Sequence, residues 1–329
     1  MDVTGEMLSK IYRTSQGNAD PDKRLTKEQV GEMFGLTYGQ VGGLIYRYEQ
    51  TLNNVLPEER PELFEVELAP EPPFNIEGDV MIVGDVHVPC TDYGMAGRVS
   101  MIAERCGVRT LIIAGDLFNN DFATRHEKRN LLGHRWKAEL EAARILLQEW
   151  TMFFDDVYFF AGNHDRWITG KLDGEMSMDD LMRIVSSADN LHVSEWGYMN
   201  VSSGGYKWRI GHGSKYSINT LTRASNHAQK FQANYWGQHQ HHCAVGWDRY
   251  KNYVIVDGPA LVDPEKLAYV QMDDSDAAGM STGFGMLLEG TPHLFANEPY
   301  TNWQLWLPEE TANIVPFSTN GKTKRSVAA

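Results

Sequence analysis

Polar side chains gather in this sequence wherever an apolar run ends. In the segment FFAGNHDRW, residues 159–167, an amide, an imidazole and a carboxylate follow one another as Asn163, His164 and Asp165. These are poor core residues, because a polar group that is buried without a partner costs free energy. Similar groups follow the other apolar runs, and they are Asp85 and His87 in GDVH, Asp116 in GD, His212 in GHG, and His239, His241 and His242 in GQHQHH.

The residue types in this set are those that bind metal ions. Carboxylate and amide oxygens suit hard divalent cations, whereas imidazole suits zinc, iron and other transition metals. A mixed set of this size suits two transition ions that share one carboxylate. Alternation along a strand would place Asp85 and His87 on the same face, and the same spacing unites His239 with His241. His242 leaves a second register open, and we prefer His239 and His241.

The elements that must position these groups form an α/β pattern. Three apolar runs at residues 79–85, 109–116 and 156–165 alternate with helical stretches. This alternation predicts a mainly parallel sheet that helices cover on both faces. Later runs, YKWRIGHG, ANYWGQHQHH and NYVIVDG, predict a second group of strands with less helix between them. Ligands of open α/β sheets sit beyond the carboxyl ends of strands, and the polar groups fall there each time.

The order of these motifs, D-x-H, G-D, G-N-H-D, G-H and H-x-H, resembles that of the calcineurin-like metallophosphoesterases. The resemblance covers roughly residues 79–262 and implies a β-sandwich of two sheets flanked by helices. It also implies a catalytic histidine that binds no metal, His164. The implied metal ligands are Asp85, His87 and His241 for one ion, Asn163, His212 and His239 for the other, and Asp116 for both.

Two departures from the family pattern narrow the resemblance. The usual Gly-His-x-His is here GQHQH, so Gln238 intervenes after the glycine. Protein phosphatases of the superfamily carry Asp-Arg-Gly after the second motif, whereas this chain has GDLFNND, with Asn119 three residues beyond Asp116. The sequence is therefore more similar to the branch that contains Mre11- and SbcD-like nucleases and small phosphodiesterases.

The resemblance implies a hydrolase with two divalent metal ions as cofactors. Two such ions, about 3.5–4 Å apart, polarise phosphoryl oxygens and activate a water near neutral pH. Mn²⁺ is the favoured ion, and Fe, Zn, Ni and Mg also fit the ligand set. Asp116 must be a carboxylate in order to serve both ions, which makes it part of the catalytic apparatus. His164 would stabilise developing charge or protonate the leaving group, an effect of about 10²–10⁴-fold.

Further residues near the motifs are candidates for roles around the metals. Asp165 is expected to orient its neighbours rather than to bind a metal. The candidate phosphate contacts are Arg125, His126, Arg166 and Asn119. For these positions a solvated loop residue is an equally weighted alternative.

Residues 1–50 are predicted to be helical and to resemble a helix-turn-helix. Thr26 is a candidate N-cap, Val30 and Met33 fall on one helical face, and the sequence FGL makes the turn. Thr37 caps the next helix. The inward positions of that helix are Val41, Leu44 and Ile45. A DNA-binding module and a protein-interaction module remain alternatives of equal weight.

Charge and composition divide the chain and limit its partners. The net charge is −14, which argues against a broad electrostatic grip on nucleic acid. Residues 1–50 carry a net charge of −1, and residues 51–78 carry seven acids, five prolines and a single basic residue, a net of −6. We predict a module at 1–50, an acidic linker at 51–78, a phosphoesterase domain at 79–290 and a C-terminal extension at 291–329.

The remaining features predict a protein of a reducing compartment. No apolar run approaches the ~18 residues of a membrane span, no secretory signal is visible, and three scattered cysteines make no disulfide framework. We expect a cytoplasmic protein of a bacterium or a phage-infected host, and the oligomeric state stays open. The leading function is phosphodiester hydrolysis with DNA or another nucleic acid as substrate. The alternatives are an enzyme that acts on small or cyclic nucleotides and a non-catalytic DNA-bound regulator or scaffold.

Overall fold

The chain divides into two compact units, Met1–Pro70 and Glu71–Ala329, which are described separately. The structure is a computed structural model. It describes residues 5–15, 24–53, 73–123, 136–172, 175–267, 279–297 and 300–307. In the part of the chain that it describes, no helix has both the length and the apolar character needed to cross a membrane.

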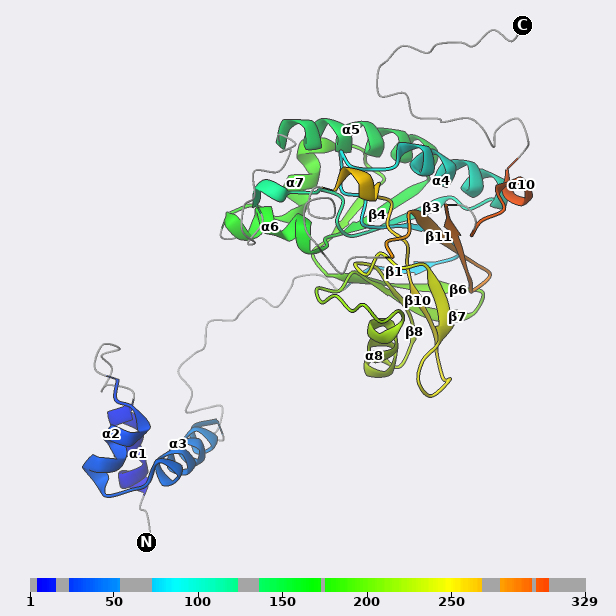
Figure 1. The fold of residues 1–329 in the computed structure, drawn as a ribbon. Coiled ribbons are helices and arrows are strands. Elements are labelled where there is room, and N and C mark those ends of the chain that lie inside the picture. Colours follow the sequence, from blue (N-terminus) through cyan, green and yellow to red (C-terminus); the bar gives the residue numbers. More distant parts are fainter. Residues whose placement is uncertain are drawn as a thin grey trace, which may run out of the picture. The chain divides into compact units, whose positions relative to one another are not determined.

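The first unit contains three helices, α1 (Gly5–Ser15), α2 (Lys27–Phe34) and α3 (Tyr38–Asn53) (Figure 1). The predicted N-cap of α2 is present, because Thr26 and Gln29 exchange reciprocal side-chain hydrogen bonds with each other's backbone N–H. Gly35 ends α2 with a left-handed φ of 65°. The buried core of the unit is made by Ile11, Val30, Val41 and Leu44.

One position of this unit differs from the sequence expectation. Met33 was placed on the inward face with Val30, but its side chain is 64% exposed. Phe34, four residues after Val30, packs against the core instead. In a helix, residue i+4 points closer to the direction of residue i than residue i+3 does. Phe34 rather than Met33 therefore takes the inward position beside Val30.

The second unit holds two six-stranded sheets (Figure 1). The order of the first sheet is β12 (Thr291–Ala296), β11 (Gly283–Leu288), β2 (Val80–Val83), β3 (Thr110–Ala114), β4 (Asp156–Phe160) and β5 (Leu191–Ser194). Strands β2 to β5 run parallel, and β11 is antiparallel to β2 and to β12. The carboxyl ends of β2, β3 and β4 therefore meet at one edge.

The second sheet mixes parallel and antiparallel pairs. Its order is β1 (Asn75–Glu77), β6 (Tyr198–Ser203), β7 (Tyr206–Gly211), β8 (Asn234–Gly237), β10 (Val254–Asp257) and β9 (Ala244–Trp247). Strands β6 and β7 form an antiparallel pair, whereas β7, β8 and β10 are parallel neighbours. The parallel strands bring the ends of β7 and β8 to the same edge.

The core lies between the two sheets, as the predicted β-sandwich requires. Strand β2 is buried on both faces, so it reads as a continuous apolar run rather than an alternating one. Val80 and Ile82 pack toward the second sheet, where Trp208 and Trp236 belong to the same buried cluster. Met81 faces the other way, into a cluster shared with helices. The two-sheet fold with flanking helices is confirmed.

Helices cover the outer faces of both sheets (Figure 1). Helices α4 (Tyr93–Cys106), α5 (Trp136–Phe153) and α7 (Met178–Val185) contribute to the buried cluster on the first sheet. Helix α8 (Thr222–Phe231) packs on β8 and β10 of the second sheet. Four short helical segments complete the described chain, η3 (Asp121–Ala123), α6 (Asn163–Lys171), η4 (Pro264–Lys266) and α10 (Trp303–Trp306).

The strands extend past the boundaries that the sequence suggested for the phosphoesterase domain. Strand β1 lies within the range 51–78 assigned to a linker, and it pairs with β6. Strand β12 lies within the range 291–329 assigned to an extension, and it pairs with β11. Both are edge strands. Their short, weakly periodic sequences give little signal next to prolines and turn residues.

Candidate dimetal centre

The predicted site residues lie at the common edge of the two sheets, most of them in loops and Asn163, His164 and Asp165 in the first turn of helix α6. From the first sheet they follow β2, β3 and β4, and from the second sheet they follow β7 and β8. Loops from five separate strands thus converge on one place. This is the position at which open parallel sheets build ligand sites.

The backbone of these loops is unusual. Five of the candidate ligands have a positive φ, a conformation that residues other than glycine seldom adopt: Asp85 (50°), His87 (48°), Asp116 (52°), His239 (79°) and His241 (54°). Backbone strain of this kind clusters at functional sites, where the surrounding structure holds it in place.

The backbone of these loops shows that one expectation from the sequence was wrong. Asp85 with His87, and His239 with His241, were expected to share a face by alternation along a strand. Strand β2 ends at Val83 and β8 ends at Gly237, so all four residues lie beyond the strands. Their side chains converge because the backbone turns through left-handed conformations, not because a strand alternates.

The first group of side chains that could hold a metal ion consists of Asp85, His87 and His241, all buried. Their donor atoms lie within 4.8 Å of one another. His241 Nε2 is 3.0 Å from Asp85 Oδ1. Both ring nitrogens of His87 are buried and have no hydrogen-bond partner in the described structure. A buried imidazole whose two nitrogens have no protein partner calls for another partner, and a metal ion would supply one.

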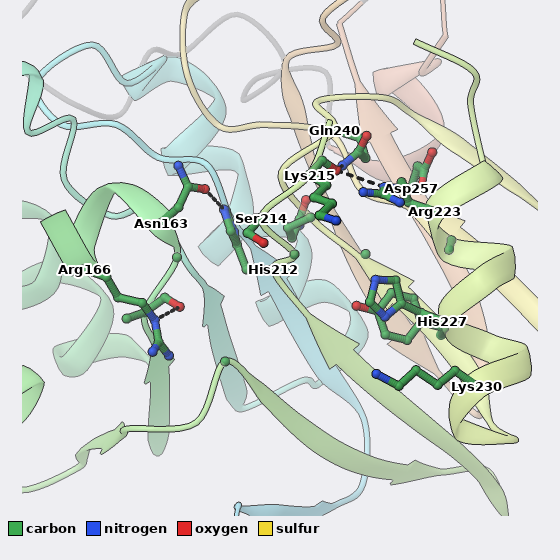
Figure 2. A pocket seen from close by; sticks show the side chains of 18 residues that line it. Asn163, Arg166, His212, Ser214, Lys215, Arg223, His227, Lys230, Gln240 and Asp257 are labelled. Atoms are coloured by element: carbon green, nitrogen blue, oxygen red, sulfur yellow. Dashed lines mark hydrogen bonds between the residues drawn. The ribbon is translucent and has the colours of Figure 1, made fainter. Parts of the chain in front are cut away.

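The second group contains Asp116, His212 and His239, again together with Asp85. The ring of His212 is oriented by a hydrogen bond from Nδ1 to the carbonyl of Ala114 at 2.9 Å. Its Nε2 then lies 3.0 Å from Asp116 Oδ2. Figure 2 shows the contact of the same nitrogen with Asn163, whose Oδ1 is 3.3 Å away. Both implied ligand sets therefore come together in space.

His242 lies apart from both groups. Its Nδ1 is 3.1 Å from Asp257 Oδ2, at the end of β10. Among the described residues, the metal-competent groups include His239 and His241 but not His242. The geometry thus favours the H-x-H register over the alternative that the sequence left open.

His164 is held from several sides next to Asp116. Its backbone N–H donates to Asp116 Oδ1 at 2.8 Å. Its ring Nδ1 donates to the carbonyl of Asn119 at 2.6 Å, because a carbonyl oxygen can only accept. The ring packs on Trp167, with centroids 3.9 Å apart, and meets the His87 ring edge-on at 4.6 Å. With Nδ1 committed to the carbonyl, Nε2 is the ring nitrogen that remains. His164 also forms a third group of possible metal ligands with His87 and Asp116.

Asp165 connects the loops rather than the ligands. Its carboxylate accepts three backbone N–H groups, those of Asp116 at 2.7 Å, Phe118 at 3.0 Å and Gly162 at 2.9 Å. Gly162 has to be a glycine, since a Cβ there would collide with the Asp116 carboxylate. The turn after β4 is thereby drawn against the turn after β3.

The two buried carboxylates are stabilised in their ionised form. Burial opposes ionisation, yet the neighbouring His241 and His212 hold the pKa of Asp85 below its usual value. For Asp116, burial is likewise outweighed by His212 and His164, which hold its pKa well below the usual range. The same two carboxylates raise the pKa of His212 to about 10 against the effect of burial.

Two other imidazoles of the site are kept neutral. Burial, followed by the nearby His164, lowers the pKa of His87 to about 3. Burial and the neighbouring His212 lower the pKa of His239 to about 4. A neutral imidazole has a free lone pair, which is the form that binds a metal ion.

The donor set fits divalent cations. Asp85 and Asp116 are fully buried, and among the described residues their ion-pair partners are histidines, with no lysine or arginine. His212, whose pKa is raised, is shared by both carboxylates, so a metal ion would compensate the negative charge that remains. The mixture of carboxylate, amide and imidazole ligands suits a transition metal.

The expected substrate contacts have different environments. Arg166 is exposed and lines a cavity of about 650 Å³ that is also lined by Asn163 and His212 (Figure 2). The side chain of Asn119 is 1% exposed, and its amide donates to Asp121 at 2.8 Å, so its contact with His164 runs through the backbone. Arg125 and His126 lie outside the described residues.

Four residues around the site were not singled out from the sequence. Lys215, Arg223 and Lys230 line the same cavity as Arg166. Glu139 of α5 is 1% exposed and accepts the backbone N–H of Asn120 at 2.9 Å. A glutamate in an amphipathic helix, or single basic residues spread over 16 positions, carry no pattern that would have marked them.

The solved structures that resemble this chain are distant from it at the level of sequence. No curated protein matches this chain. Solved structures that resemble it include Vps29 from Entamoeba histolytica in complex with Zn²⁺, with 11% identity and a TM-score of 0.33, covering 67% of this chain and 98% of that one. Vps29 from Chaetomium thermophilum shows 10% identity and a TM-score of 0.37, with 68% and 95% covered.

A Thermotoga maritima protein, TM1076, shows 12% identity and a TM-score of 0.32, with 67% of this chain and 98% of that chain covered. The model of the calcineurin-like phosphoesterase family matches residues 78–263, more than half of the chain. That range contains strands β2 to β10 and every candidate ligand named above. The chain therefore belongs to the calcineurin-like phosphoesterase family.

Proposed function

We propose that this chain is a dimetal-dependent phosphodiesterase, with nucleic acid as its favoured substrate. One observation carries the proposal. Two buried carboxylates, Asp85 and Asp116, are surrounded by imidazole side chains, and no lysine or arginine of the described chain pairs with them. The ring of His87 in this group has no hydrogen-bond partner in the described structure. Such a site is expensive to maintain in a folded protein unless divalent cations occupy it.

The proposed ligand roles are those that the family resemblance implies. Asp116 Oδ2 lies 3.9 Å from His87 Nε2 and 3.0 Å from His212 Nε2, so it is near both sets. Asp85 also belongs to both groups of donor atoms. Asp85, His87 and His241 would hold one ion, and Asn163, His212 and His239 would hold the other, with Asp116 shared between them. When bound, the two metal ions would supply Lewis acidity toward the phosphoryl oxygens and would activate water for attack. Mn²⁺ is the favoured metal, since the set combines hard oxygens with imidazole nitrogens.

The other residues would act on the substrate or on the loops. His164 donates Nδ1–H to the carbonyl of Asn119, which fixes the orientation of its ring. Its Nε2 would donate a proton or a hydrogen bond to the leaving oxygen, while Asp165 keeps the Asp116 and Gly162 backbones together. Arg166 would contact a substrate phosphate from the cavity side.

Nucleic acid is favoured as substrate by the resemblance to nuclease branches and by the three helices of the first unit. We propose a four-part chain: a module at 1–50 that delivers the enzyme to a macromolecule, an acidic linker, the phosphoesterase domain and a C-terminal segment. Small or cyclic nucleotides are the second candidate, because a net charge of −14 opposes broad contact with a polyanion. A non-catalytic scaffold is disfavoured by the complete ligand set.

A metal and substrate screen tests this proposal. Purified protein would be stripped with chelator, reloaded with Mn²⁺, Mg²⁺, Zn²⁺, Fe²⁺ or Ni²⁺, and assayed on single-stranded DNA, duplex DNA, RNA and cyclic nucleotides. We expect about two ions per chain and Mn²⁺-dependent cleavage of a nucleic acid. Cleavage of cyclic nucleotides alone would favour the second candidate, and metal binding without any turnover would favour the scaffold.

A further inference from the structure

The cavity next to the candidate metal centre is strongly basic. It is about 650 Å³, within the range of small-molecule sites. Its charged lining consists of Arg166, Lys215, Arg223, Lys230 and a single carboxylate, Asp257. Four cations against one carboxylate stand out in a chain whose net charge is −14.

The cations of this cavity are not neutralised by the protein. None of the four takes part in a salt bridge within the described residues. Arg166 donates to the backbone carbonyl of Glu195 at 3.1 Å, and Arg223 donates to that of Lys215 at 3.2 Å. These bonds orient the guanidinium groups but leave their charge uncompensated.

The one carboxylate of the cavity is already engaged. Asp257 Oδ2 accepts the backbone N–H of Leu221 at 2.6 Å and lies 3.1 Å from His242 Nδ1. Figure 2 shows it on the side of the cavity where Lys215 and Arg223 lie. Among the described residues, its buried Oδ1 has no hydrogen-bond partner, and its one ion-pair contact is with His242. The four basic side chains are therefore left for a ligand.

The positive charge of these side chains affects a histidine in the cavity wall. The ring of His227 lies in this wall and stacks on Tyr235, with centroids 4.8 Å apart and planes at 11°. Burial, followed by the positive charge of Arg223 and Lys230, lowers the pKa of His227. A neutral ring backed by an aromatic ring, beside two cations, is a surface that accepts an anion and a flat group together.

The cavity is continuous with the second candidate metal site. Asn163 and His212, two proposed ligands of one ion, form part of its wall (Figure 2). Arg166 lies on one side of the opening, and His227 with Lys230 lies on the other. A phosphate bound at the metals would therefore have the remainder of its molecule directed into a basic chamber.

We infer that this cavity is a subsite for a second phosphate group of the substrate, bound by Arg166, Lys215, Arg223 and Lys230 while the scissile phosphate occupies the metal centre. This inference rests on the proposed phosphodiesterase function and specifies its substrate class. The preferred substrate carries two phosphates joined through a nucleoside. An oligonucleotide backbone and a free nucleoside bisphosphate share this chemistry.

The kinetic test compares two esters that differ by one phosphate. They are the 4-nitrophenyl ester of thymidine 5′-phosphate and the same ester with an added 3′-phosphate. With the Mn²⁺-loaded full chain, kcat/KM should be about tenfold or more higher for the second ester, the size of one charge-assisted hydrogen bond. Comparing kcat/KM for a short oligothymidylate with that for the bisphosphate ester shows whether the second phosphate belongs to a nucleic-acid backbone or to a free nucleotide.

The variants Arg223→Gln, Lys230→Gln and their combination should remove this preference mainly through KM, while turnover of the ester without the second phosphate stays within about twofold. The double variant Lys207→Gln/Lys251→Gln removes two exposed lysines that do not line this cavity, and it should keep the full preference. If the double cavity variant unfolds, the comparison is made with the single variants Arg223→Gln, Lys230→Gln and Lys215→Gln.

A binding experiment separates the subsite from the catalytic proposal. Calorimetric titration of chelator-treated protein with thymidine 3′,5′-bisphosphate and with thymidine 5′-monophosphate should show tighter binding of the bisphosphate, lost in Arg223→Gln/Lys230→Gln. If neither ester is hydrolysed but this charge-dependent binding is present, the phosphodiesterase function fails and the subsite stands. Equal binding and equal kcat/KM for the paired ligands, or a preference that survives in the cavity variants, overturns the subsite.

Discussion

The carboxylate of Asp165 accepts the backbone N–H of Asp116 at 2.7 Å, across 49 positions of the sequence. It also accepts the N–H of Phe118 and of Gly162. One buried side chain thus joins the turn after β3 to the turn after β4. The position of Asp116, the proposed shared ligand, relative to His164 depends on these hydrogen bonds, because Asp116 follows β3 and His164 follows β4.

The first prediction concerns this joint. Asp165→Asn replaces an oxygen that accepts an N–H by an amide nitrogen that cannot accept, so a buried donor loses its partner. We expect a loss of about 2–3 kcal/mol in the free energy of unfolding. Thermal and denaturant unfolding of the second unit would measure it. The control is Asp156→Asn, whose half-exposed carboxylate contacts His192 at the surface and should change stability by less than about 0.5 kcal/mol.

The second prediction is a pH dependence of stability from Glu139. Burial is the main cause that raises the pKa of this carboxyl to about 8. In the unfolded chain the group ionises near its ordinary pKa, so between about pH 4.5 and pH 8 unfolding releases a proton. Its contribution to stability is therefore greatest below pH 4.5, falls as the pH rises to 8, and stays constant above.

Glu139→Gln isolates this effect, since the amide oxygen can still accept the N–H of Asn120. The difference in unfolding free energy between the wild type and this variant should fall by a few kcal/mol, on the order of the pKa shift, between pH 5 and 8. Other titrating groups cancel in the difference. A difference that does not change with pH would show that Glu139 is ionised in the folded protein.

The sequence predicted the convergence of the site better than the reason for it. The order of the motifs after parallel strands places Asp85, Asp116 and Asn163 at one edge of the sheet, which any parallel arrangement of β2, β3 and β4 requires. The left-handed turns at Asp85 and His87 could not be anticipated, because they depend on what the folded surroundings enforce. Periodicity describes strands and helices, whereas most of the candidate ligands lie in loops and Asn163 lies at the very start of helix α6.

The basic cavity and the role of Glu139 were beyond the sequence for another reason. Arg166 and Lys230 come from different helices on different sheets, so their proximity is a property of the sandwich and not of spacing. Glu139 follows the helical pattern of a surface glutamate, and only the approach of the loop at Asn120 buries it. Edge strands β1 and β12 were missed because pairing, not composition, makes them strands.

The third prediction is metal dependence centred on Asp116. Chelation should abolish hydrolysis, and Mn²⁺ should restore it more effectively than Mg²⁺, since imidazole ligands disfavour Mg²⁺. Asp116→Asn should remove turnover and lower the metal content, because the ligand that is proposed to serve both ions loses its charge. Metal analysis alongside an assay with a chromogenic diester measures both. Full activity after exhaustive chelation would be fatal to the proposed mechanism.

The fourth prediction separates catalysis from coordination. His164→Gln should retain both metal ions while kcat falls by about 10²–10⁴, because its ring meets the substrate and is held by the Asn119 carbonyl. His241→Gln should instead lower the number of bound ions, since its Nε2 faces Asp85 at 3.0 Å. His192→Gln, at the surface beside Asp156, is the matched control and should change neither quantity. Loss of an ion in His164→Gln would mean that this histidine is a ligand.

The last prediction concerns the delivery role of the first unit, which has its own core and contains none of the candidate ligands. Deleting residues 1–55 should leave kcat/KM for a small chromogenic phosphodiester within about twofold and lower activity on long DNA. The intact protein should bind DNA weakly and with a steep salt dependence that the deletion removes. Lys27→Gln and Arg47→Gln should reduce that salt dependence, and Lys251→Gln, in the second unit, should not. A deletion that stays folded but loses activity on the small diester would place the first unit in the active site or in an obligatory oligomer, and delivery would be excluded.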